Sequence, residues 1–178
     1  MIGIDNLNKN NSRIIWENHN GRKKLYTITS ASKNQYRDWS PFDSKLSAAL
    51  FNGLEIFPFK PSSKIFYSND SSDTTLNHLF DIIDSIGMIY IQKSSVKIKN
   101  SKNVVIIDNE KDNTVDKHNG KEQFDVIYLD ITNNQNLEAE ILNHETNLKN
   151  LGFAIIIFHS TSKTNDSSFK NQINNIIN

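Results

Sequence analysis

The feature that most constrains this chain is an alternation of short, continuously apolar runs with helix-like segments between residues 64 and 158. Continuous apolar runs of this kind are typical of strands that are buried on both faces of a parallel sheet. Strands are predicted at residues 64–67, 88–91, 104–107, 124–130 and 153–158. Helical spacing predicts helices at residues 44–51, 75–84 and 137–150. The pattern therefore predicts an α/β domain with a doubly wound, Rossmann-like sheet.

The residues before this pattern predict a smaller β structure. Two strand-like segments, residues 13–17 and 24–28, flank Asn18–Gly21, which is typical of a hairpin turn. We therefore divide the chain into an N-terminal β-hairpin extension, residues 1–35, and a main domain, residues 36–178.

Doubly wound sheets bind their ligands beyond the carboxyl ends of the strands. In this chain that edge is predicted to carry Tyr67–Thr75, Lys93, Glu110, Asp130 and His159. The loop after the first strand, Tyr67–Thr75, contains no glycine. Cofactor-binding α/β proteins normally place glycines there, because glycine lets the backbone turn tightly and approach the ligand. The sequence therefore predicts a ligand site at this edge with an altered loop.

Composition excludes several classes of protein. The 178 residues include 20 Lys and Arg, 20 Asp and Glu, and no Cys, so the net charge is zero and disulfide bonds and cysteine-bound metals are excluded. A balanced charge does not favour a protein that grips long nucleic acid by itself. No apolar run approaches the roughly 20 residues that span a bilayer, and the five histidines form no close cluster for zinc. We expect a cytoplasmic protein without a membrane segment or a resident metal.

One segment resembles a known family closely. Residues 36–49, YRDWSPFDSKLSAA, resemble the YRxWxPxxSKLxAA motif of fibrillarin-like proteins, and the likeness extends over roughly residues 13–165. These proteins are RNA 2′-O-methyltransferases of box C/D guide RNA particles. The resemblance implies a methyltransferase sheet, a role in rRNA or tRNA processing, and S-adenosylmethionine as cofactor. It also implies three partners: a Nop-domain scaffold protein, a kink-turn-binding protein and the box C/D guide RNA.

The resemblance also implies site residues. Lys45 and Asp130 match a lysine and the aspartate of the family's catalytic set, and His159 stands where a second lysine is usual. The family's catalytic histidine belongs to a strand that would follow Asn178, so we expect this chain to lack it. The positions that match cofactor-binding residues are Thr74, Thr75, Lys93, Ser94, Glu110, Lys111, Asp130, Ile131, Thr132 and Asn133. Methyl transfer to a 2′-hydroxyl needs such groups to deprotonate the hydroxyl and aim it at the methyl group.

Several of these positions depart from the family pattern. Asn69 and Asp73 replace the two glycines of the loop, and Lys93 replaces an acid that holds the ribose hydroxyls. A lysine cannot accept hydrogen bonds from hydroxyl groups. Glu110 keeps an acid where the family contacts adenine, but on a longer side chain. Our leading hypothesis is a fibrillarin-like pseudoenzyme or weak enzyme, in which binding of S-adenosylmethionine and catalysis are lost or impaired.

Two other hypotheses remain open. One is an active RNA 2′-O-methyltransferase with a remodelled site, which the matches at Lys45, Thr74, Thr75 and Asp130 favour. The other is a degraded gene product with a sheet that is truncated at its C-terminal end. In that case the strand at residues 153–158 is an unpaired, apolar edge, and we expect the isolated chain to be poorly soluble.

Each candidate residue also has an ordinary interpretation. Lys45 can be a solvated lysine at the start of a helix. Asp130 can cap a helix that follows it, over residues 132–136. His159 can be a substitute base, because histidine titrates near neutral pH, but a solvent-facing histidine at a strand end is the favoured interpretation.

The motif contains three aromatic residues, Tyr36, Trp39 and Phe42. Exposed aromatic rings can stack on RNA bases. Beside Pro41, packing of the hairpin against the main domain is the favoured interpretation, so we expect all three rings in the core.

Overall fold

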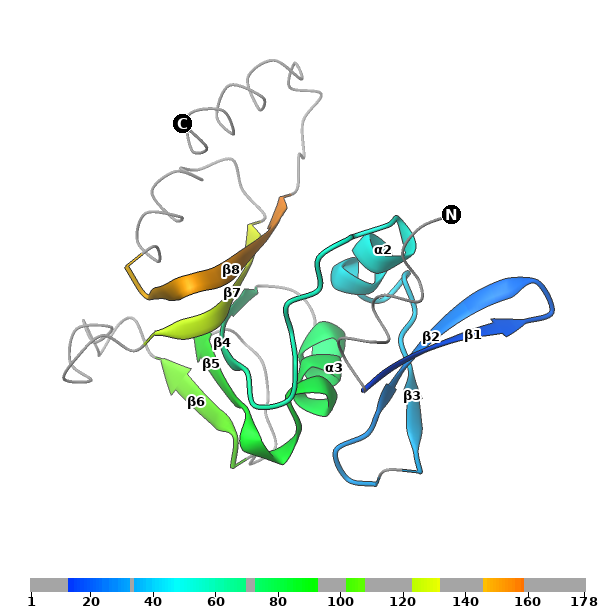
Figure 1. Cartoon of the computed structure of the whole chain (residues 1–178), viewed down its shortest axis with the longest axis horizontal. Helices are drawn as coiled ribbons and strands as arrows, with labels where there is room; N and C mark the ends of the chain where they lie inside the picture. Colours follow the sequence, from blue (N-terminus) through cyan, green and yellow to red (C-terminus); the bar gives the residue numbers. More distant parts are fainter. Residues whose placement is uncertain are drawn as a thin grey trace, which may run out of the picture.

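The computed structural model of the chain describes residues 13–32, 34–69, 73–92, 102–107, 123–131 and 146–158. In this part of the chain the backbone forms two sheets, and the helix α3 (Asp73–Ile83) lies between them (Figure 1). The N-terminal sheet is antiparallel and the larger sheet is parallel. The predicted α/β class is therefore confirmed.

The N-terminal sheet confirms the predicted hairpin and extends it. β1 (Ile14–His19) and β2 (Arg22–Ile28) are antiparallel, and β3 (Tyr36–Asp38) pairs with the other side of β2. Asn20 and Gly21 form the turn with φ values of 52° and 77°. Positive φ values at both positions match the twist of the two strands, which is why Asn-Gly is favoured there. The domain boundary at residue 35 stays a prediction, and β3 pairs with the N-terminal sheet across it.

Five parallel strands form the larger sheet in the described part of the chain, as predicted. They are β4 (Lys64–Asn69), β5 (Met88–Gln92), β6 (Val104–Ile107), β7 (Phe124–Ile131) and β8 (Leu148–Phe158). Their order across the sheet is β6-β5-β4-β7-β8, so β8 is the outermost described strand on its side. The direction of strand addition reverses between β4 and β7. A reversal of this kind is where doubly wound sheets bind ligands.

β4 and β7 end side by side at this reversal. Asn69, the last residue of β4, lies opposite Asp130 of β7. Tyr67 and Tyr128 are also paired in register, and their rings stack with centroids 5.0 Å apart and planes at 9°. Because side chains alternate along a strand, Tyr128 and Asp130 lie on the same face of the sheet.

The described helices pack on that face. α2 (Lys45–Phe51) and α3 confirm two of the predicted helices, and the 3-10 turn η1 (Asp84–Ile86) follows α3. The buried residues that α3 packs on this face are Leu76, Leu79, Ile82 and Ile83. The buried residues of the opposite face are Phe66, Phe124, Ile127 and Leu129. No helix within the described residues is long and apolar enough to cross a bilayer.

The prediction of a helix over residues 137–150 is wrong for its last residues. β8 already begins at Leu148, which lies opposite Phe124 of β7, while residues 137–145 lie outside the described part. Phe124 N donates to the carbonyl of Asn147 at 2.8 Å, so pairing with β7 starts before the predicted strand. The pairing is irregular, and Leu151 within it has a φ of 64°. Long-range pairing thus overrides the local helical spacing.

Candidate active site

Lys45 and Asp130 form the centre of the candidate site. Lys45 Nζ donates to both carboxylate oxygens of Asp130, at 2.7 Å to Oδ1 and 2.6 Å to Oδ2. The side chain of Asp130 is 1 % exposed, whereas that of Lys45 is 30 % exposed. Lys45 is therefore the more exposed member of the pair. The interpretation of Lys45 as a simple solvated lysine is wrong.

Ser44 fixes the position of Lys45 at the start of α2. The Ser44 hydroxyl caps α2 by accepting from the N–H of Ser47 at 3.3 Å. The same hydroxyl lies 2.9 Å from Thr75 Oγ1, in the first turn of α3. One buried side chain therefore joins the starts of both helices and holds Lys45 and Thr75 at the same edge of the sheet.

Tyr128 adds a neutral, buried hydroxyl on the same face of β7 as Asp130. Burial raises the pKa of the Tyr128 hydroxyl, and the neighbouring Tyr67 and Asp130 raise it further. Tyr128 therefore keeps its proton at neutral pH and does not act as a base. Its role is to pack against Tyr67 and to support the end of β7.

Five of the predicted site residues fall within the described ranges. Lys45, Asp130 and Thr75 come together as described, Thr74 precedes Thr75 in the first turn of α3, and Ile131 ends β7. The other predicted site residues lie outside the described part of the chain: Lys93, Ser94, Glu110, Lys111, Thr132, Asn133 and His159. Their roles stay predictions.

Asn69 and Asp73 are the described residues at the end of β4 and the start of α3. Asn69 ends β4 opposite Asp130, and Asp73 is the first residue of α3. The N-terminus of a helix carries partial positive charge and free N–H groups, which suit an anionic ligand group. The two positions at which the resemblance implies glycines thus lie at the end of β4 and at the start of α3.

Two of the three motif aromatics do not lie in the core. Trp39 is 0 % exposed, as predicted, but Tyr36 is 57 % and Phe42 96 % exposed. Tyr36 points outward because its neighbour Arg37 takes the inward-facing position of β3, where it binds Asp81. Phe42 lies in the turn that precedes α2. Stacking of Tyr36 and Phe42 on RNA bases stays a prediction.

Sequence reasoning missed the link between Ser44 and Thr75. The signal for each residue was present, because Ser44 precedes a helical segment and Thr75 lies in the predicted ligand loop. Only the tertiary structure brings them together. Across the described ranges, no group of three or more His, Asp or Glu side chains is arranged to hold a metal ion.

Together these features define a class of protein. A doubly wound sheet with a helix N-terminus and polar side chains at the strand reversal is the arrangement in which α/β domains bind ligands. The family model described as Fibrillarin matches residues 2–177. The chain belongs to the fibrillarin family.

Two relatives show the extent of the similarity. The chain is 32 % identical over 151 residues to the fibrillarin-like rRNA/tRNA 2′-O-methyltransferase of Methanococcus aeolicus, with 79 % of this chain and 65 % of the relative covered. It is 30 % identical over 146 residues to the RNA 2′-O-methyltransferase FBLL1 of Mus musculus, with 76 % of this chain and 46 % of the relative covered. The match therefore spans 46–65 % of the length of these two proteins.

Solved structures show the same fold. The Methanococcus jannaschii fibrillarin pre-rRNA processing protein superposes with a TM-score of 0.74 at 26 % identity, with 92 % of this chain and 86 % of that chain covered. Aeropyrum pernix fibrillarin, solved with natively bound S-adenosyl-L-methionine, gives 0.75 at 20 % identity over 93 % and 83 % of the chains. A fibrillarin/Nop5p complex gives 0.68 at 22 % identity over 91 % and 85 %.

Proposed function

We propose that this chain is the fibrillarin-type subunit of a box C/D guide RNA particle that acts in rRNA or tRNA processing, and that its affinity for S-adenosylmethionine is impaired. One observation supports the role as a fibrillarin-type subunit: Lys45 and Asp130 form an ion pair at the strand reversal of a fibrillarin fold, and Ser44, next to Lys45, is hydrogen-bonded to Thr75. The impaired affinity is supported by the loop, in which Asn69 and Asp73 stand in place of glycines.

The residues of the site fit only part of S-adenosylmethionine. The start of α3, with Thr74 and Thr75, suits the carboxylate of the ligand, because free helix N–H groups bind anions. An aspartate such as Asp73 at that start competes for the same N–H groups and repels a second carboxylate. At Asn69 a side chain replaces the glycine that would let the ligand approach the backbone. We therefore infer that the site keeps an anion-binding helix end at α3 and that Asn69 and Asp73 weaken binding of the cofactor beside it.

Restoring the glycines tests the impairment directly. We expect the double variant Asn69→Gly, Asp73→Gly to bind S-adenosylmethionine at least about tenfold more tightly than the wild type in isothermal titration, a change of roughly 1.4 kcal/mol. Ser62→Gly, in the turn before β4, controls for the general effect of an added glycine. Equal affinities of all three proteins would show that the loop does not limit binding.

Partners of this chain are proposed on the same basis. The fibrillarin/Nop5p complex has the same fold as this chain, and we propose a Nop-domain scaffold protein, a kink-turn-binding protein and a guide RNA as its associates in the cytoplasm. Co-migration with a reconstituted scaffold–guide RNA particle in size-exclusion chromatography is the expected result. If the chain co-migrates with none of the Nop-domain scaffold proteins encoded in the same genome, the assignment to a particle is wrong.

A second candidate function is an active RNA 2′-O-methyltransferase, which the intact Lys45–Asp130 pair favours. S-adenosylmethionine, when bound, would supply the methyl group as a sulfonium. The half-buried ammonium group of Lys45 can donate a hydrogen bond to a ribose oxygen and stabilise the negative charge that develops there. Asp130 holds that ammonium group in place through both carboxylate oxygens.

Methyl transfer in the reconstituted particle decides between the two candidates. An active enzyme would transfer radiolabelled methyl groups to guide-paired RNA, and Lys45→Met would reduce the rate by about a hundredfold or more. Absence of transfer with all partners present supports the impaired subunit. A wild-type rate that Lys45→Met does not change would remove Lys45 from the reaction in either case.

A further inference from the structure

Lys45 and Thr75 lie on different helices, and the N-terminal sheet contacts both helices. Trp39, the residue after β3, makes the central contact. Its ring stacks on His78 of α3, with centroids 4.7 Å apart and planes at 16°. Its carbonyl accepts a hydrogen bond from Ser47 Oγ of α2 at 2.7 Å. Trp39, which is fully buried, therefore contacts both α2 and α3.

Asp81 ties α3 to the same sheet through its carboxylate. Asp81 Oδ2 accepts from Thr27 Oγ1 at 3.0 Å and from Arg37 Nε at 2.7 Å. Asp81 Oδ1 accepts from the N–H of Ser30 at 3.1 Å. The side chain of Asp81 is 2 % exposed and that of Arg37 is 45 % exposed. A carboxylate this deeply buried depends on such partners, because an unpaired charge in the interior is strongly destabilising.

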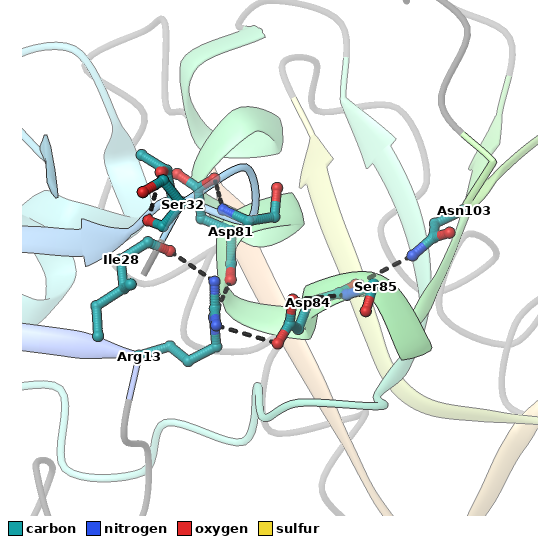
Figure 2. A network of polar contacts seen from close by, with 9 residues as sticks. Arg13, Ile28, Ser32, Asp81, Asp84, Ser85 and Asn103 are labelled. Carbon is teal, nitrogen blue, oxygen red and sulfur yellow. Dashed lines mark hydrogen bonds and ion pairs between the residues drawn. The ribbon is translucent and has the colours of Figure 1, made fainter. Parts of the chain in front are cut away.

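Arg13 extends the network to the C-terminal end of α3 (Figure 2). Its guanidinium donates to the carbonyl of Ile28 at 2.9 Å, to the carboxylate of Asp84 at 3.1 Å, and to the main-chain carbonyl of Asp81. A cation suits this end of the helix, where the last carbonyl groups carry partial negative charge. The N-terminal sheet thus holds α3 both along its side and at its end.

The contacts of α3 fall on one polar side of the helix. Thr75, His78 and Asp81 follow one another at a spacing of three residues, which places them on one face. Thr75 contacts α2, whereas His78 and Asp81 contact Thr27 of the N-terminal sheet. Apolar contacts tolerate a small slide or rotation of a helix. Hydrogen bonds between buried groups form in one register, so this network fixes the position of α3.

We propose that Arg37 is a positioning residue for the candidate active site. Through Asp81 it sets the rotation of α3 about its axis and its position along that axis, and thereby the place of Thr75 near Lys45 and Asp130. The N-terminal sheet is then part of the support of the site. The expected effect of Arg37 on binding of S-adenosylmethionine rests on the proposed function. Its expected effect on the position of Thr75 does not depend on that function.

Arg37→Gln tests this against a control at a cation of similar exposure, whose partner Asp125 is 29 % exposed where Asp81 is 2 % exposed. Lys149 makes an ion pair of the same length with Asp125, 2.7 Å, and is similarly exposed at 42 %, but it lies at the amino end of the strands. Arg37→Gln and Lys149→Gln therefore remove comparable surface cations, one facing α3 and one remote from it. The readouts in the ligand-free protein are the methyl resonance of Thr75 and amide hydrogen exchange of residues 77–80, the first N–H groups bonded within α3.

The expected result separates positioning from simple stabilisation. Arg37→Gln shifts the Thr75 methyl resonance and speeds exchange at residues 77–80 about tenfold, while Lys149→Gln changes neither. Arg37→Lys keeps the charge without the Nε geometry and is expected to recover stability but not the Thr75 resonance. If Arg37→Gln lowers the melting temperature yet leaves the Thr75 resonance and the exchange of α3 unchanged, the proposal is wrong. Thr27→Val removes the hydroxyl shared by His78 and Asp81 and provides the same comparison if Arg37→Gln does not fold.

Ligand titration keeps this inference separate from the proposed function. In the loop-reverted Asn69→Gly, Asp73→Gly protein, Arg37→Gln is expected to weaken binding of S-adenosylmethionine about fivefold or more, and Lys149→Gln to leave it unchanged. If the loop-reverted protein binds no S-adenosylmethionine, the proposed function fails, and the resonance and exchange data still decide the role of Arg37. If it binds and Arg37→Gln has no effect on affinity, the expected effect on the ligand is wrong, and the resonance and exchange data alone decide whether Arg37 positions Thr75.

Discussion

Acidification is expected to destabilise the folded protein through His78. His78 is 1 % exposed, and its Nδ1 lies 2.8 Å from Thr27 Oγ1. The Thr27 hydroxyl donates its hydrogen to Asp81, so neutral His78 donates from Nδ1 to Thr27. Burial lowers the pKa of His78 from 6.5 to about 4, with Asp81 opposing this change and Arg37 adding to it. The folded state thus prefers the neutral ring.

The sign and size of the effect follow from these two pKa values. The unfolded chain takes up a proton at His78 near pH 6.5, whereas the folded protein resists protonation until about pH 4. The stability linked to His78 is therefore complete above pH 6.5 and is lost progressively as the pH falls toward 4. Between about pH 7.5 and about pH 5 the loss is about 2 kcal/mol. For a chain of this length, that corresponds to a fall in melting temperature of roughly 4–8 °C.

Urea unfolding at about pH 7.5 and about pH 5 measures this loss. In His78→Gln the amide can still donate to Thr27 but does not titrate, so we expect its free energy of unfolding to fall by about 2 kcal/mol less than that of the wild type over this interval. His19→Gln, at an exposed position of β1, should keep the wild-type pH dependence. Equal losses in the wild type and in His78→Gln would refute the argument from burial.

Three further predictions concern single contacts. Lys45→Met deprives the buried Asp130 carboxylate of its cation and should lower the free energy of unfolding by about 3–5 kcal/mol in urea titration. Adding Asp130→Leu to this variant should recover most of that loss, and no recovery would contradict the pairing. Gly87→Ala places a Cβ 2.5 Å from Ile83 Cβ and should destabilise the protein by about 1–3 kcal/mol, so an unchanged melting temperature would argue against the close approach. Phe42→Ala should leave the melting temperature unchanged within about 1 °C, because the ring is almost fully exposed, and a fall of several degrees would show that Phe42 is packed in solution.

Local pattern was sufficient to predict the sheet and the hairpin. The strand at Val104–Ile107 has the predicted bounds, because a strand of a parallel sheet is recognisable as a continuous apolar run even at the edge, where Ile106 is exposed. The turn at Asn20 and Gly21 is equally local, since two residues with positive φ determine it. Lys45 and Asp130 were found through the family resemblance, and the structure joins them in one ion pair.

The remaining features depend on contacts between distant parts of the chain. Leu148–Asn150 has helical spacing, but pairing with β7 makes it a strand. The hydrogen bond between Ser44 and Thr75 joins residues 31 apart, and that between Arg37 and Asp81 joins residues 44 apart. Neither separation leaves a periodic signal in the sequence. The exposure of Phe42 was also missed, because the residues around an aromatic side chain in a motif do not show whether its ring is buried.

The most direct single measurement is an isothermal titration of the wild-type chain with S-adenosylmethionine. We expect no saturable binding in the low micromolar range, because the sequence has Asn69 and Asp73 at positions where glycines would let the ligand approach the backbone. Saturable binding with a Kd of about 10 μM or below would contradict the impaired affinity and would show that a loop without glycine can hold this cofactor.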